Sequence, residues 1–222
     1  MKRAALFALC LAAGALQYQS AVADPAPSRI HGSIKSFDGQ YLTVKADSGQ
    51  SVVVGVQPAT HIVHSRRIAL TDLKSGDPVG TLALIGADTK LRAQAIRVFS
   101  SAMHSPGEGQ YPLESNPSRM VTNGTVAAVA STPSGGTLTL NFHGAATQGA
   151  NACTGHAAPG GWGCTGTAEL MIARGVPIIA MSDGDTTLLL PGAIVSVLTS
   201  ADATSLLTAS SITVERDGKP AQ

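Results

Sequence analysis

The stretch that decides the fold is His31-Gly32-Ser33-Ile34-Lys35, a turn, and then Tyr41-Leu42-Thr43-Val44-Lys45. The chain repeats this plan at Asn123-Gly124-Thr125-Val126-Ala127 and again at Thr137-Leu138-Thr139-Leu140-Asn141. Alternation of apolar and polar residues predicts half-buried strands. Asp38-Gly39 predicts a tight hairpin turn between the first two strands, because such turns need positive φ. The sequence therefore carries one hairpin-based unit twice.

The repeat extends well beyond this hairpin. Leu73-Lys74-Ser75-Gly76-Asp77-Pro78-Val79 aligns with Leu189-Leu190-Pro191-Gly192-Ala193-Ile194-Val195, and each copy closes on a long predicted strand. A period of about 90 residues is too long for a solenoid repeat. We therefore expect two copies of one small domain. The first copy covers residues 24–99 and the second copy residues 121–216, with a linker at residues 100–120 and a tail at residues 217–222.

The order of predicted elements is the same in both copies. Three strands are followed by a connector and two further strands, and the second copy carries an insertion at residues 144–167. In the first copy the connector covers residues 57–74, shows no period of two, and has one helical turn near residues 69–73. This is the order of an OB-fold, a five-stranded Greek-key barrel. We predict an all-β protein of two tandem OB-like barrels, with SH3-like barrels as the alternative.

The first 23 residues have the features of a secretory signal peptide. Lys2 and Arg3 precede an apolar stretch, and Ala21-Val22-Ala23 fits the cleavage rule. We therefore expect a periplasmic or secreted bacterial protein with no membrane span after cleavage. Removing the two basic residues leaves 13 basic and 14 acidic residues, a net charge of −1. Such a balance disfavours nucleic acid as a partner.

Two cysteines, Cys153 and Cys164, follow the predicted leader, and both lie in the insertion of the second copy. An even pair of cysteines in an exported protein predicts a disulfide. The Cys-x-x-His spacing to His156 also fits a zinc site, but a disulfide would remove both thiolates. Trp162 lies in the same loop. We expect His156 and Trp162, with Tyr41 on the first hairpin, to contact a ligand or partner.

Met103, His104 and Glu108 in the linker form a candidate metal site. A thioether together with an imidazole suits copper. The alternative is a linker whose glycine and proline residues only set the path between the domains. His61 and His64 form a second pair in the connector of the first copy, beside Arg66-Arg67. Two adjacent arginines oppose a cation, so we interpret this segment as a polar connector.

The hairpin Asp38-Gly39-Gln40-Tyr41-Leu42-Thr43-Val44 and the turn Leu70-Thr71-Asp72-Leu73-Lys74-Ser75-Gly76-Asp77-Pro78-Val79 carry a resemblance to a known family. They resemble a family of small exported bacterial OB-like domains of unknown function. Residues 175–179 and 190–193 are similar to a divergent member, as found in tandem-domain proteobacterial proteins. The resemblance covers most of the mature chain and rests on turn motifs. It implies a fold, and it brings no catalytic residues.

The sequence shows no pattern typical of catalysis. No G-x-S-x-G follows a predicted strand, and no glycine-rich loop opens a helix. We therefore expect a non-enzymatic periplasmic binding or interaction module without a cofactor. One alternative is a metal-handling protein for copper or zinc. Another is a cell-envelope accessory protein that binds a protein or glycan partner through residues 144–167.

Overall fold

The computed structural model describes residues 28–103, 107–113, 115–144, 156–157, 164–201 and 206–215. These residues are all-β, as predicted, with two short 3-10 helices and no α-helix among them. Within the same ranges, no helix is long and apolar enough to cross a membrane. The predicted signal peptide, the tail, and the residues His104, Cys153 and Trp162 lie outside the described residues.

The strands follow the two copies of the repeat in chain order. The bounds are β1 (Ser28–Phe37), β2 (Tyr41–Ala46), β3 (Ser51–Gly55), β4 (His61–Arg67), β5 (Pro78–Ile85), β6 (Leu91–Phe99), β7 (Gly109–Leu113), β8 (Asn116–Thr132), β9 (Gly135–Gly144), β10 (His156–Ala157), β11 (Cys164–Ala173), β12 (Ile178–Asp183), β13 (Ile194–Ala201) and β14 (Leu207–Glu215). The 3-10 helices are η1 (Leu70–Asp72), where one helical turn was predicted, and η2 (Thr186–Leu188).

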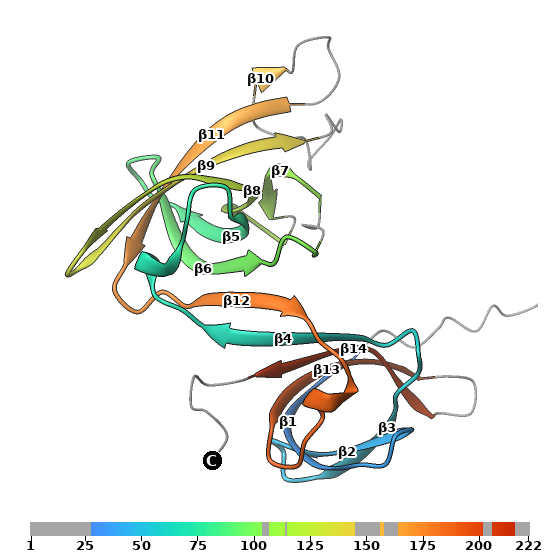
Figure 1. Ribbon diagram of the computed structural model, residues 1–222. Coiled ribbons are helices and arrows are strands. Elements are labelled where there is room, and N and C mark those ends of the chain that lie inside the picture. Colours follow the sequence, from blue (N-terminus) through green and yellow to red (C-terminus); the bar gives the residue numbers. More distant parts are fainter. Residues whose placement is uncertain are drawn as a thin grey trace, which may run out of the picture.

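The described strands form one large sheet that curls into two lobes (Figure 1). The lower lobe of Figure 1 contains β1, β2, β3, β13 and β14, and the upper lobe contains β5, β6, β8, β9 and β11. Each lobe closes through a thin parallel contact. In the lower lobe β3 meets β14 at one residue pair, and in the upper lobe β11 meets β6 at two. The rings are therefore not regular barrels.

Each lobe combines strands from both copies of the repeat. In the lower lobe, β1 of the first copy pairs with β13 of the second copy. In the upper lobe, β8 of the second copy pairs with β5 of the first copy. The registers are equivalent, because Gly32 lies opposite Val195 and Gly124 lies opposite Val79. The two copies have thus exchanged their last two strands within one chain.

The hydrophobic cores show the same exchange. The lower core joins Ile34, Leu42 and Val54 of the first copy to Val195 and Ile212 of the second copy. The upper core joins side chains of β5 and β6 to side chains of β8, β9 and β11. The ranges 24–99 and 121–216 describe the sequence repeat, but neither range alone supplies one of the two cores.

The lobes are joined by an antiparallel pair, β4 and β12. β4 also pairs in parallel with β14 of the lower lobe, and β12 with β6 of the upper lobe. The sequence predicted no strand in either segment. For residues 57–74 that prediction is wrong, because β4 lies between two strands from the other copy and buries Ile62, Val63 and Ser65. Because the consecutive residues Ile62 and Val63 are both buried, the sequence of β4 does not show the alternation of apolar and polar residues that predicts a half-buried strand.

The expected linker, residues 100–120, also contains regular structure. β7 lies within it, pairs with β8, and is followed by the start of β8 itself. The side chain of Asn123 in β8 donates a hydrogen bond to the Gly107 carbonyl oxygen at 2.9 Å. The described parts of this segment therefore add a strand to the upper lobe.

Candidate functional site

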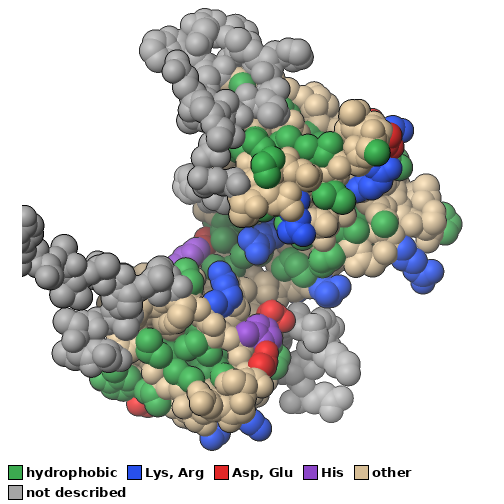
Figure 2. All heavy atoms as spheres, turned by 180° about the vertical axis from the view of Figure 1, so that it is seen from behind, with side chains coloured by type: hydrophobic (Ala, Val, Ile, Leu, Met, Phe, Trp, Pro, Cys, Tyr) green, Lys and Arg blue, Asp and Glu red, His purple; other side chains and the backbone are tan. Residues whose placement is uncertain are grey.

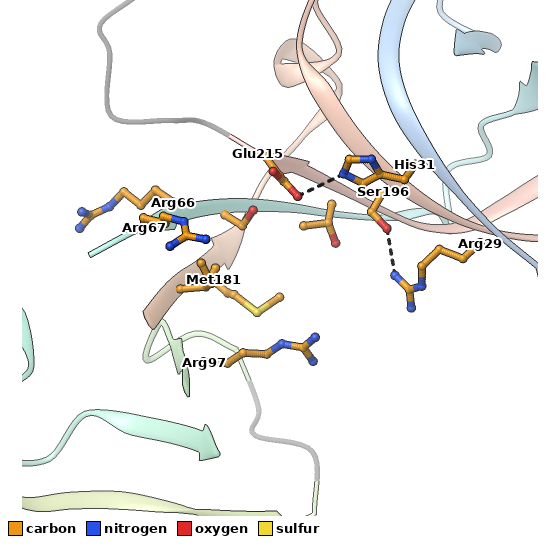
Figure 3. Close-up of a pocket in the computed structure, with 11 residues that line it drawn as sticks. Arg29, His31, Arg66, Arg67, Arg97, Met181, Ser196 and Glu215 are labelled. Carbon is orange, nitrogen blue, oxygen red and sulfur yellow. Dashed lines mark hydrogen bonds and ion pairs between the residues drawn. The ribbon is translucent and has the colours of Figure 1, made fainter. Parts of the chain in front are cut away.

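A cavity of about 310 Å³ lies where the two lobes meet the bridging strands β4 and β12. Four arginines line it, namely Arg29, Arg66, Arg67 and Arg97, together with His31 and Glu215. Figure 3 shows Arg29, Arg67 and Arg97 extending from different strands toward the same space, with Met181 among them, whereas Arg66 extends away from it. We call this space the arginine cavity.

Strand register explains why these residues lie together. Directly paired residues in neighbouring strands place their side chains on the same face of a sheet. His31 is opposite Ser196, and Ser196 is opposite Thr213. Thr213 is opposite Val63 of β4. Four residues further along β4, Arg67 is opposite Ile179, and Ile179 is opposite Arg97. A single face of the sheet thus runs from β1 in the lower lobe to β6 in the upper lobe.

The arginine side chains concentrate positive charge at this junction. Figure 2 shows basic side chains gathered where the lobes meet, with a histidine and acidic side chains nearby. Arg29 donates a hydrogen bond from Nη1 to the Ser196 hydroxyl at 3.0 Å. Within the described ranges, Arg66, Arg67 and Arg97 have no ion pair with an acidic side chain. Four of the chain's 15 basic residues therefore line one cavity in a nearly neutral protein.

His31 contacts two acidic side chains, and one of them, Glu215, lines the cavity. Its Nδ1 lies 2.6 Å from Oδ2 of Asp47, and its Nε2 lies 3.6 Å from Oε1 of Glu215. The hydrogen bond to Asp47 raises the pKa of His31, and the charge of Glu215 adds to this effect. When it is protonated, His31 offsets part of the negative charge of Glu215 at the edge of the cavity.

The cavity holds a serine and a histidine with a nearby aspartate, but their geometry differs from that of a nucleophilic triad. In a triad, the histidine nitrogen far from the carboxylate meets the serine hydroxyl. Here that nitrogen faces Glu215. The Ser196 hydroxyl instead accepts a hydrogen bond from Arg29. Guanidinium groups are suited to carboxylate and phosphate ligands, which they bind through paired hydrogen bonds.

The residues predicted from sequence as ligand or metal contacts lie elsewhere. Tyr41 is 40% exposed on β2 and lines a separate cavity of about 490 Å³ near Leu206 and Thr208. The backbone carbonyl of Glu108 accepts a hydrogen bond from the Tyr111 hydroxyl at 2.5 Å. Neither Glu108 nor Met103 lines the arginine cavity. Across the described ranges, no three His, Cys, Asp or Glu side chains are grouped as metal ligands.

The predicted disulfide loop falls mostly outside the described residues. Cys164 is buried at the start of β11, where it lies opposite Gly144 of β9. Residues 156–157 form the short strand β10 against β11, which places the backbone of His156 beside Thr165. The disulfide with Cys153 stays a prediction.

Sequence reasoning missed most of the arginine cavity. It identified Arg66 and Arg67 as part of a polar connector and did not single out Arg29, Arg97 or Glu215. The available signal was weak, since each of these residues occupies an outward position of a strand. Their convergence depends on pairing between the copies, which no local pattern encodes.

Comparisons with known proteins found no relative. No family model matches the chain, no curated protein matches it, and no solved structure matches it.

Proposed function

We propose that this protein is a non-enzymatic binding module of the bacterial periplasm, and that it binds an anionic ligand in the arginine cavity. We propose further that its two lobes are OB-like units that exchange strands. One observation carries the functional proposal. Arg29, Arg67 and Arg97, from β1, β4 and β6, extend toward one cavity, and Arg67 and Arg97 have no ion pair within the described ranges.

Electrostatics favours a bound anion in this cavity. The guanidinium groups at the cavity carry like charges, which repel one another more strongly in a protein environment than in bulk water. A ligand with carboxylate or phosphate groups would offset this repulsion and satisfy the guanidinium donors. The cavity, at about 310 Å³, is within the usual range for small-molecule sites. The same charges would repel a metal cation.

The arrangement supports binding more than catalysis. A nucleophilic serine needs a base within hydrogen-bond reach, whereas the Ser196 hydroxyl is engaged by Arg29. A general base would also need to be free to take a proton, whereas His31 is held between Asp47 and Glu215. An envelope glycan or protein segment bearing acidic groups fits the cavity as a partner. The metal-handling alternative stays a prediction, and no contact in the described ranges favours it.

Titration of the mature chain, residues 24–222, with sodium pyrophosphate at low ionic strength tests the proposal. We expect saturable binding by calorimetry, with amide shifts in the NMR spectrum centred on Ser65 and Ser196. A charged hydrogen bond contributes about 1.5–3 kcal/mol, so Arg67→Gln should weaken binding about tenfold or more. Arg174→Gln is the matched control, because Arg174 is exposed in the turn after β11 and lies outside the cavity.

Two results would contradict the proposal. The first is the absence of saturable binding to pyrophosphate, to inorganic phosphate and to fructose 1,6-bisphosphate. The second is equal loss of binding in the Arg67→Gln and Arg174→Gln variants, since that would reflect general charge alone. A screen for esterase and phosphatase turnover completes the test. Turnover that disappears in Ser196→Ala would replace binding with catalysis as the function.

A further inference from the structure

We infer that the arginine cavity contains two anion subsites on different lobes, so that its ligand carries two separated anionic groups joined by an uncharged spacer. This inference rests on the proposed function and names its ligand class. The lower subsite is Arg29 with the Ser196 hydroxyl, and the upper subsite is Arg67 with Arg97.

The first argument is distance. Arg29 is on β1 and Arg97 is on β6, and the path between them through β13, β14, β4 and β12 crosses five strand intervals. Neighbouring strands lie about 4.8 Å apart, so the two backbones are separated by up to about 24 Å along the curved sheet. That path follows the curved sheet, and in Figure 3 the Arg29 side chain enters the cavity from the opposite side to Arg67. Arg67 and Arg97, in contrast, are two intervals apart and both paired with Ile179.

The second argument is the apolar part of the cavity lining. Ile179 and Met181 of β12 also line the cavity, and Ile179 is paired with both arginines of the upper subsite. In Figure 3 the Met181 side chain extends from the side of Arg67 toward Arg29, which approaches from the opposite side. An uncharged spacer suits these two apolar side chains, because a charge placed against them would lack a partner there. Thr213 adds a hydroxyl that can contact a spacer such as a sugar.

The third argument is the charge difference between the subsites. The lower subsite contains Glu215 and His31 beside Arg29. The arginines of the upper subsite have no acidic partner among the described residues. The upper subsite should therefore bind an isolated anion first, and the lower subsite should add affinity only when a second anionic group is tethered to it. Tethering makes the second contact intramolecular and so raises the overall affinity.

Calorimetric titration with three probes tests the two subsites. The probes are inorganic phosphate, pyrophosphate, and fructose 1,6-bisphosphate, which separates two phosphates by a sugar. We expect the sugar bisphosphate to bind at least tenfold more tightly than inorganic phosphate and more tightly than pyrophosphate. Arg29→Gln should reduce the affinity for the bisphosphate to that for phosphate and leave phosphate binding unchanged. Arg97→Gln should weaken binding of all three probes.

The outcomes separate this inference from the proposed function. If phosphate and the bisphosphate bind equally, or if Arg29→Gln has no effect on either, the two-subsite inference is wrong while the anion site stands. If none of the probes binds, the proposed function itself fails. Unchanged thermal midpoints of the exposed variants confirm folding, and Arg174→Gln should match the wild type throughout.

The same chemistry can come from a soluble molecule or from a lipid headgroup with two phosphates. Sedimentation with phosphatidylcholine vesicles, with and without cardiolipin, distinguishes these sources. Cardiolipin-dependent sedimentation that is lost in Arg29→Gln would place the ligand in the membrane. Binding of the soluble bisphosphate without sedimentation would place it in solution. Sedimentation that persists unchanged in both Arg29→Gln and Arg97→Gln would count against the subsites.

Discussion

Replacing Ile212 with alanine removes a fully buried side chain that the second copy contributes to the lower core. Its neighbours in that core include Leu42 and Val54 of the first copy. The exchange of strands therefore predicts an unusual result. A substitution near the end of the chain should loosen strands near its beginning, and it should affect the rest of its own copy less.

The size of the effect follows from the burial. Isoleucine to alanine deletes three carbon atoms, and each buried methylene contributes about 0.8 kcal/mol, or about 2.4 kcal/mol in all. The cavity left behind adds to this transfer cost, so the total loss is about 2–5 kcal/mol. For a chain of this size, the thermal midpoint should fall by roughly 5–15 °C.

Hydrogen exchange measured by NMR shows where the loss occurs. Amide protection should fall most in β1, β2 and β3, because these strands share the lower core with Ile212. Ile96→Ala is the matched control. Ile96 is also fully buried, and it pairs with Thr81 in β5 as Ile212 pairs with Val197 in β13. That variant should instead loosen β8, β9 and β11.

The reverse pattern would refute the exchange. If Ile212→Ala reduced protection mainly in β8, β9 and β11, and left β1 to β3 unchanged, each copy would be folding on itself.

Two further predictions concern β1. Because the hydrogen bond to Asp47 raises the pKa of His31, its contribution to stability is complete below the ordinary pKa of 6.5 and is lost as pH rises through the raised value. Both side chains are largely exposed, so the contribution is small, about 0.2–1 kcal/mol. Urea denaturation between about pH 5 and pH 8 should show this loss of stability in the wild type and not in His31→Gln. If the free energy of unfolding depended on pH in the same way in both proteins, the pair of His31 and Asp47 would not be the cause. Gly32→Ala should lower the free energy of unfolding, measured by urea denaturation, by about 1–3 kcal/mol, because the added methyl group of β1 would overlap the Lys45 carbonyl oxygen of β2. An unchanged free energy of unfolding would mean that β1 and β2 lie less close together at this position.

The all-β class and most hairpins could be predicted because their signals are local. Gly39, Gly49 and Gly76 have positive φ in the structure, as their turns require. The alternation in Tyr41–Ala46 likewise matches the burial of Leu42 and Val44. Such patterns depend on residues that are neighbours in the chain. β4 escaped prediction because its burial is set by β12 and β14, which are distant in sequence.

The sequence by itself determined the repeat, the turns and the alternation that makes each strand half-buried. It could not determine which copy supplies the partner of each strand. Val79 and Val195 hold equivalent places opposite Gly124 and Gly32, so β1 meets nearly the same surface in either pairing. Only the tertiary structure shows that β1 pairs with β13 and β8 pairs with β5. This pairing built the bridge of β4 and β12, and it brought Arg29 of β1 and Arg97 of β6 onto one face of the sheet.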